Sequence, residues 1–124
     1  MEKTLDRTTL GKRVKEYRLK SGYSAAKLGK LTGVSKSHIN NIESANCNAS
    51  AEVLVRIANV LDTSIDVLLC ESLNGKASQQ ARMYEFAKML EDCSDLETKI
   101  IVETVKVLKK NLKEAETVTA GDSK

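Results

Sequence analysis

The sequence predicts an all-α protein, and three observations support this class. The 124 residues include no proline, whereas average usage of about 5% would give roughly six, so the helices meet no proline break. Aromatic residues make up only 3% of the chain, so aliphatic side chains must build the core. Apolar residues recur at helical spacing, as in Leu10, Val14 and Tyr17 at i, i+4 and i+7. The length fits one domain, or one small domain with an appendage.

Five short helices are expected in residues 1–70, each opened by a hydroxyl side chain that can act as an N-cap. They are expected over residues 8–22, 23–33, 34–44, 50–64 and 64–69, with Thr8 or Thr9, Ser24, Ser35, Ser50 and Ser64 as caps. Leu28 and Leu31 are expected to face inward from the second helix, and Leu54, Ile57, Ala58 and Leu61 from the fourth. These five helices form the first expected domain.

The second half of the chain is expected to hold a helical hairpin. Residues 71–79 are rich in Gly, Asn and Ser, which is typical of a linker. The hairpin is expected over residues 80–114, with a break before Ser94, where Ser94 and Glu97 have the spacing of a capping box. Residues 115–124 are expected to be a disordered tail.

One face of the last helix is apolar, and it carries Ile101, Val105, Leu108 and Leu112. Neighbouring aliphatic residues widen this face, so one partner helix cannot cover it. A second copy of the hairpin is the simplest cover, which predicts a homodimer with these four residues in the interface. The alternative is that the hairpin folds back on the first five helices.

The charge is uneven along the chain. The net charge is +3, but residues 1–44 hold ten Lys or Arg against four Asp or Glu. A local positive surface suits a polyanionic partner, although such a face can also be merely solvated. The amino terminus lacks the apolar stretch of a signal peptide, and no segment approaches a membrane span, so we expect a cytoplasmic protein without a membrane partner.

The residues that usually carry catalysis or bind metals are sparse. The three cysteines, Cys47, Cys70 and Cys93, lie far apart without a CxxC pair, which argues against disulfides and zinc. His38 is the only histidine. Neither a nucleophile with a base nor a phosphate-binding loop is present. We therefore expect no enzyme activity, no metal and no cofactor.

Two short helices joined by a tight turn, the second of them polar on one side, define a helix-turn-helix. In "KLGKLTGVSKSHINNIE", residues 27–43, Gly29 permits close approach of the two helices and Gly33 can take the positive φ that reverses the chain. Val34, Ile39 and Ile42 anchor the second helix, which leaves its polar residues for an outward surface. Such donors and acceptors suit base edges and phosphates.

These residues, with "RVKEYRLKSGYS" before and "LVRIANVLDTSIDVLL" after, resemble the lambda-repressor-like helix-turn-helix family of Cro/CI or XRE type. The resemblance covers residues 10–69 and implies a five-helix domain that binds double-stranded DNA. It implies base contacts by Lys36, Ser37 and Asn41, marginal contacts by His38 and Asn40, phosphate contacts by Ser24, Lys27, Asn46 and Asn48, and a structural ion pair between Arg18 and Glu43.

The expected function is therefore a sequence-specific transcriptional regulator, a repressor that binds a pseudo-palindromic operator as a homodimer. The chain departs from the family's pattern at Ala25, where a phosphate-binding glutamine is common, and in the uncharged loop 44–50, which is often basic. These departures favour an alternative, an antitoxin-like interaction module whose hairpin binds a partner protein.

Overall fold

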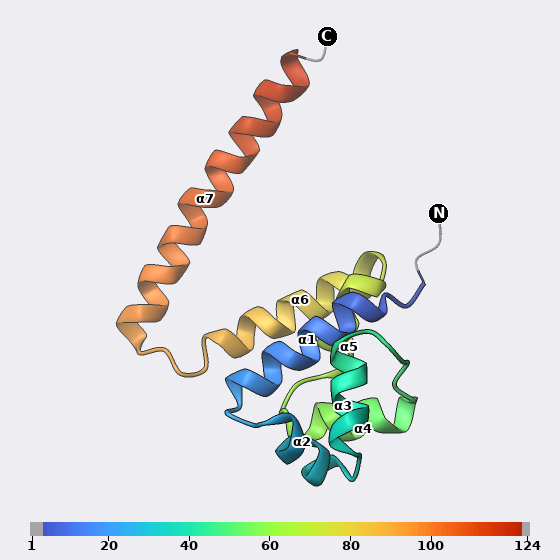
Figure 1. Cartoon of the computed structure of the whole chain (residues 1–124). Coiled ribbons are helices and arrows are strands. Elements are labelled where there is room, and N and C mark those ends of the chain that lie inside the picture. The colour runs from blue at the N-terminus through green and yellow to red at the C-terminus, as the bar shows by residue number, and fades with distance from the viewer. Residues whose placement is uncertain (1–3, 123–124) are drawn as a thin grey trace. The chain divides into compact units, whose positions relative to one another are not determined.

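The computed structural model describes the backbone of residues 4–122 and the side chains of residues 4–118, and every element in that part of the chain is helical (Figure 1). The elements are α1 Arg7–Lys20, α2 Ala25–Thr32, α3 Lys36–Glu43, α4 Ala51–Val60, α5 Ile65–Leu68, the 3-10 turn η1 Cys70–Ser72, α6 Gly75–Met89 and α7 Asp95–Asp122. The all-α prediction is confirmed. The chain divides into two compact units, one ending at Glu85 and the other beginning at Phe86.

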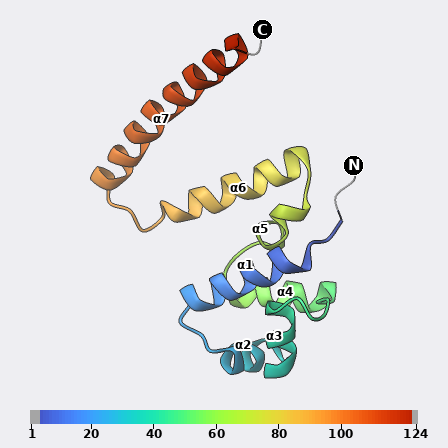
Figure 2. The ribbon, with the colours of Figure 1, turned by 45° about the horizontal axis from the view of Figure 1, so that its top comes forward.

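Helices α1 to α5 gather around one aliphatic core in the first unit (Figure 2). The buried residues of this core are Leu10, Val14, Leu28, Ile39, Ile42, Leu54, Ile57, Ala58, Leu61 and Leu68. The four residues that we expected to face inward from α4 are among them. Leu31 is not, because Thr32 takes the inward place on α2, where its hydroxyl donates to the carbonyls of Leu28 and Gly29.

Serine caps begin four of the short helices as the sequence predicts. The side chains of Ser24, Ser35, Ser50 and Ser64 each accept a hydrogen bond from the backbone N–H three residues later. Helix α1 differs, because Asp6 caps it by accepting from the N–H groups of Thr8 and Thr9. The carboxylate also suits the positive end of the helix dipole, so the helix starts one residue before Thr8.

Residues 71–79 differ from the expected linker. Ser72 lies in η1 and its hydroxyl accepts a hydrogen bond from the backbone N–H of Asp6 at 2.8 Å. Helix α6 starts at Gly75, whose φ of +55° suits glycine, and Ser78 donates to the carbonyl of Cys70 at 3.1 Å. This segment is therefore held on the first unit, and that unit ends at Glu85 rather than at the expected residue 70.

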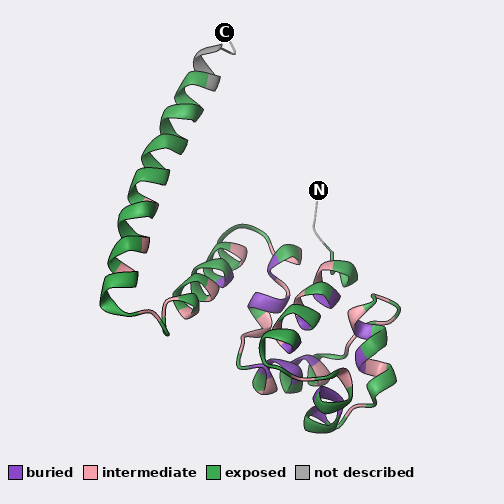
Figure 3. Cartoon of the chain, turned by 60° about the vertical axis from the view of Figure 1, so that its left-hand side comes forward, coloured by how far each residue is buried: buried purple, intermediate pink, exposed green. Residues whose placement is uncertain are grey.

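The second unit is dominated by α7, a helix of 28 residues. Its start is the predicted capping box, since the Glu97 N–H donates to Ser94 Oγ and the Ser94 N–H donates to the Glu97 carboxylate, each at 3.1 Å. The expected disordered tail, 115–124, is helical as far as Asp122, because neither proline nor an early glycine stops the helix; residues 123 and 124 lie outside the described part. Most of α7 is exposed (Figure 3). None of the described helices is long and apolar enough to cross a bilayer.

Candidate nucleic-acid interface

The turn between α2 and α3 depends on two glycines. A Cβ atom at Gly29 would lie 2.5 Å from the carbonyl oxygen of Val34, so only glycine lets the chain pass this closely without a shift. Gly33 has φ of +74° in the left-handed region and ends α2. Ser35 then caps α3 two residues later. The polar helix therefore begins directly against the end of α2, as a helix-turn-helix requires.

Helix α3 has two distinct faces. Ile39 and Ile42 are 0% and 1% exposed and hold the helix on the core. The side chains that the sequence analysis assigns to base contacts, Lys36, Ser37 and Asn41, are all exposed. Asn40 is exposed as well, and with Lys15 of α1 it borders a small hollow beside α3. His38 is half-buried, with its Nδ1 3.6 Å from the Sγ atom of Cys47.

The predicted phosphate-binding residues flank this face on both sides. Ser24 and Lys27 are exposed at the start of α2, while Asn46 and Asn48 are exposed in the loop after α3. Asn46 is fixed by two hydrogen bonds, from its N–H to the Asn41 carbonyl at 2.9 Å and from its side chain to Ser44 Oγ at 3.1 Å. The loop is thus tied to the end of α3.

Arg18 of α1 and Glu43 of α3 form a buried ion pair. Arg18 Nε donates to Glu43 Oε2 at 2.7 Å, and Nη2 donates to Oε1 at 2.9 Å. The third donor, Nη1, reaches the carbonyl of Tyr23 at 2.9 Å. The hydrogen bonds with Glu43 raise the pKa of Arg18 although burial opposes this. The pair therefore fixes the carboxyl end of α3 on α1 and is not itself available to a ligand.

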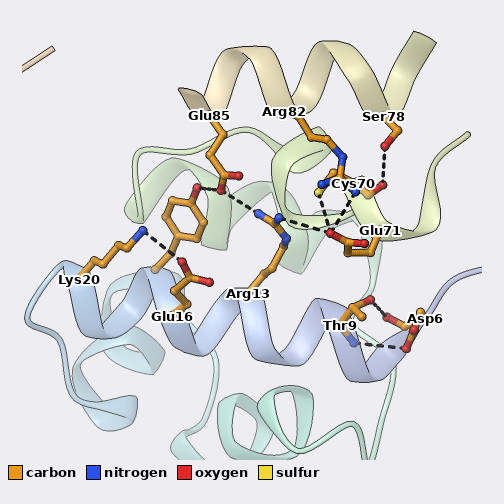
Figure 4. Close-up of polar contacts among 11 residues, drawn as sticks. Asp6, Thr9, Arg13, Glu16, Lys20, Cys70, Glu71, Ser78, Arg82 and Glu85 are labelled. Atoms are coloured by element: carbon orange, nitrogen blue, oxygen red, sulfur yellow. Dashed lines mark hydrogen bonds and ion pairs between the residues drawn. The ribbon is translucent and has the colours of Figure 1, made fainter. Parts of the chain in front are cut away.

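A second polar cluster was not foreseen from the sequence, and it joins α6 to α1 (Figure 4). Arg13 Nη1 donates to Glu85 Oε2 at 2.7 Å, and the Tyr17 hydroxyl donates to the same oxygen. Glu71 Oε1 lies 3.6 Å from Arg13 Nη2 and 3.2 Å from Arg82 Nη2. We call these five residues the α6 clasp. Tyr17 was expected in an apolar stripe, and nothing in the sequence pattern pairs Arg13 with a residue 72 positions away.

The contacts within the α6 clasp shift the pKa values of Tyr17 and Glu85. Burial raises the pKa of Tyr17, and the hydrogen bond to Glu85 raises it further, because ionised Tyr17 would face a carboxylate. Burial alone would raise the pKa of Glu85, but the hydrogen bonds from Tyr17 and Arg13 outweigh this and lower it. Glu85 is therefore held as a carboxylate at neutral pH, and its contacts attach the third turn of α6 to α1.

The four residues that the sequence predicts for a dimer interface lie along α7. Leu108 and Leu112 are 54% and 55% exposed, while Ile101 and Val105 are half-buried. Further apolar residues on α7 are exposed, including Ile100 and Val107. Among the described residues, no group of three or more His, Cys, Asp or Glu is close enough to hold a metal ion.

Comparison with known proteins shows that this part of the chain is similar to helix-turn-helix regulators. A family model described as helix-turn-helix matches residues 14–68. The transcriptional regulator SinR of Bacillus subtilis is 40% identical over 63 residues, which is 50% of this chain and 57% of SinR. A putative transcriptional regulatory protein of Methanococcus maripaludis is 30% identical over 93 residues, 73% of this chain but 28% of that protein. The chain thus spans little more than half the length of SinR. Both relatives are described as regulators of transcription.

A solved structure with the same arrangement of helices supports the fold. The clp gene regulator ClgR from Corynebacterium glutamicum is 26% identical, with a TM-score of 0.52 over 72% of this chain and 94% of that chain. This similarity supports the helical fold described above.

Proposed function

We propose that the chain, whose residues 14–68 match the helix-turn-helix family model, is a sequence-specific DNA-binding regulator of transcription of the lambda-repressor-like type. The observation that carries the proposal is the two-faced α3. Ile39 and Ile42 lock the helix on the core, so its outer face is rigid, and that face consists of polar groups only. Rigid presentation of donors and acceptors is what base recognition in the major groove requires.

The roles of individual residues follow from their positions. Lys36, Ser37 and Asn41 read base edges in the major groove, and His38 and Asn40 lie at the margin of the contact. Ser24, Lys27, Asn46 and Asn48 bind phosphates on either side, which sets the register of α3 without reading sequence. Exposed lysines such as Lys15 add a charge attraction that weakens with salt.

We further propose that the protein acts as a homodimeric repressor. Two copies of α3 would enter successive major grooves about 34 Å apart and read a pseudo-palindrome. The dimer contact lies on α7, where Ile101, Val105, Leu108 and Leu112 form a stripe of apolar side chains. Soluble helices seldom leave such a stripe facing water. A bound repressor of this kind would act by occupying its operator.

Selection of bound sequences from a random DNA pool would test DNA recognition directly. A pseudo-palindromic consensus is the expected result. Asn41→Ala should then weaken binding to the selected site by about 1–3 kcal/mol and leave binding to random DNA nearly unchanged. The matched control is Asn59→Ala on the exposed side of α4, which should alter neither. Equal losses on both DNAs would show that Asn41 does not read bases, and an empty selection would refute the proposal.

The dimer is tested by sedimentation. Ile101→Asp places a charge in the apolar stripe and should convert the dimer to a monomer, with loss of operator affinity. Lys110→Asp introduces the same carboxylate on the opposite, exposed side of α7 and should leave the dimer intact. An unchanged mass for Ile101→Asp would refute this interface.

One observation favours a second function, an antitoxin-like module that binds a partner protein. The loop at residues 44–50 carries no charge and Ala25 lacks a hydrogen-bonding side chain, so two common phosphate contacts are missing. Under this alternative, the stripe on α7 holds a different protein. Purification of a stoichiometric complex with a partner protein, together with the absence of salt-sensitive DNA binding, would decide for it.

A further inference from the structure

Cys47 lies in the loop that follows α3, beside the predicted DNA-contacting face. Its Sγ atom is 3.6 Å from Nδ1 of His38, which lies on α3 itself. Asn46 and Asn48, on either side of Cys47, are exposed, while Cys47 is half-buried and packs partly against the core. A thiol and an imidazole are thus in contact at the edge of the surface to which we assign DNA binding.

The other two cysteines have raised thiol pKa values, and neither contacts a histidine. Cys70 is 1% exposed, and burial raises the pKa of its thiol, although the nearby Arg13 opposes this rise. For Cys93, desolvation and then the carboxylates of Asp92 and Glu97 raise the pKa of the thiol. Since the thiolate is the reactive form, both environments disfavour reaction. Of the three cysteines, Cys47 is the one that contacts an imidazole, which can accept a thiol proton near neutral pH, whereas the thiol of Cys70 donates to the Glu71 carboxylate and that of Cys93 to the Met89 carbonyl.

We propose that Cys47 is a redox-sensitive modification site and that its oxidation by a hydroperoxide releases the protein from DNA. His38 accepts the thiol proton, and the thiolate sulfur attacks one oxygen of the hydroperoxide. The S–O bond forms as the O–O bond breaks, so the sulfur is oxidised by two electrons while the peroxide is reduced. The leaving oxygen takes the proton from His38, which yields a sulfenic acid and one water or alcohol.

The consequence for DNA binding rests on the proposed function. A sulfenic acid adds an oxygen to a side chain packed between the core and His38, so the loop must move and the thiol–imidazole contact is lost. Asn46 and Asn48 move with it, away from the positions proposed for phosphate contact. Any ionised sulfenate also places negative charge near phosphates. Both effects weaken the complex.

Labelling with a dimedone-type probe tests the site without reference to DNA. The reduced full-length protein is treated with hydrogen peroxide, and the rate of sulfenic acid formation at each cysteine is followed by mass spectrometry. Cys47 should react severalfold faster than Cys93, because desolvation and the carboxylates beside Cys93 raise the pKa of its thiol and so lower its thiolate fraction. His38→Gln should slow Cys47 towards the rate of Cys93 and leave Cys93 unchanged. Equal rates in the native protein would overturn the proposal.

Binding to the selected DNA tests the regulatory step. Peroxide should weaken binding about tenfold or more, the size of one lost charge-assisted contact, and a thiol reductant should restore it. Cys47→Ser should bind DNA and resist peroxide, whereas Cys93→Ser should remain sensitive. Selective oxidation without any change in binding would refute release from DNA. If the reduced protein binds no DNA, the proposed function fails, and the labelling rates still decide whether Cys47 is the reactive site.

Discussion

Replacement of Arg18 by alanine removes one partner of the ion pair that joins α1 to α3. Three donors are lost, two of them to Glu43 at 2.7 and 2.9 Å and one to the Tyr23 carbonyl at 2.9 Å. The Arg18 and Glu43 side chains are only 11% and 6% exposed, so water replaces these donors poorly. Glu43 is left as a buried carboxylate without its cation.

The expected loss in the free energy of unfolding is about 3–5 kcal/mol, as is typical when one partner of a buried pair is removed. Two charge-assisted hydrogen bonds at about 1.5 kcal/mol each, with a third bond near 1 kcal/mol, sum to about 4 kcal/mol, the middle of this range. In a unit of this size, each kcal/mol lowers the melting temperature by about 4–8 °C.

Urea unfolding followed by tyrosine fluorescence measures this loss. All three tyrosines precede Phe86 and the chain has no tryptophan, so the signal reports on the first unit. Glu16→Ala is the control, because its pair with Lys20 is about half exposed and should contribute less than about 0.5 kcal/mol. The double change Arg18→Met with Glu43→Leu should recover most of the loss. A cost below about 1 kcal/mol for Arg18→Ala would refute the reasoning.

Three further changes test other contacts. Gly11→Ala should destabilise the first unit by about 1–3 kcal/mol in urea unfolding, because the new Cβ would lie 2.5 Å from the Glu43 carbonyl oxygen, whereas the exposed Lys12→Ala should be nearly neutral. Glu85→Gln should cost about 1–2 kcal/mol at pH 7. Because the folded-state pKa of Glu85 is lowered, its contribution is present above the ordinary value of 4.5 and is lost as the pH falls through the folded-state pKa, so stability curves of the two proteins should converge in acid. Ser94→Ala should cost about 1 kcal/mol, seen as faster hydrogen exchange at the start of α7. Parallel stability curves for Glu85→Gln, or unchanged exchange for Ser94→Ala, would contradict the contacts assigned to them.

Local interactions explain why so much of the first unit was predictable. A serine cap acts on an N–H three residues away, and a glycine at positive φ ends a helix wherever it stands, so four caps and the turn at Gly33 are visible in short stretches of sequence. The periodicity of Ile39 and Ile42 likewise reveals which side of α3 is buried. The polar surface of the candidate interface is what remains after those residues are assigned to the core.

The boundary of the first unit was not predictable, because it depends on contacts between residues far apart in the chain. Met83 and Phe86 are large apolar residues of α6 that would be expected to pack against a core. They are 64% and 45% exposed, so they do not attach α6 to α1. Glu85 does so, through Arg13 and Tyr17. In the sequence a single glutamate on a charged helix looks like any solvated side chain.

The sequence by itself determined the helical class, the helix-turn-helix and the polar residues of α3, since these follow from spacing within about ten residues. Only the tertiary structure decided that α6 is clasped to α1 and that Cys47 contacts His38. Such contacts leave no periodic pattern in the sequence. They join residues far apart in the chain, and the three-dimensional path of the backbone determines which side chains come into contact.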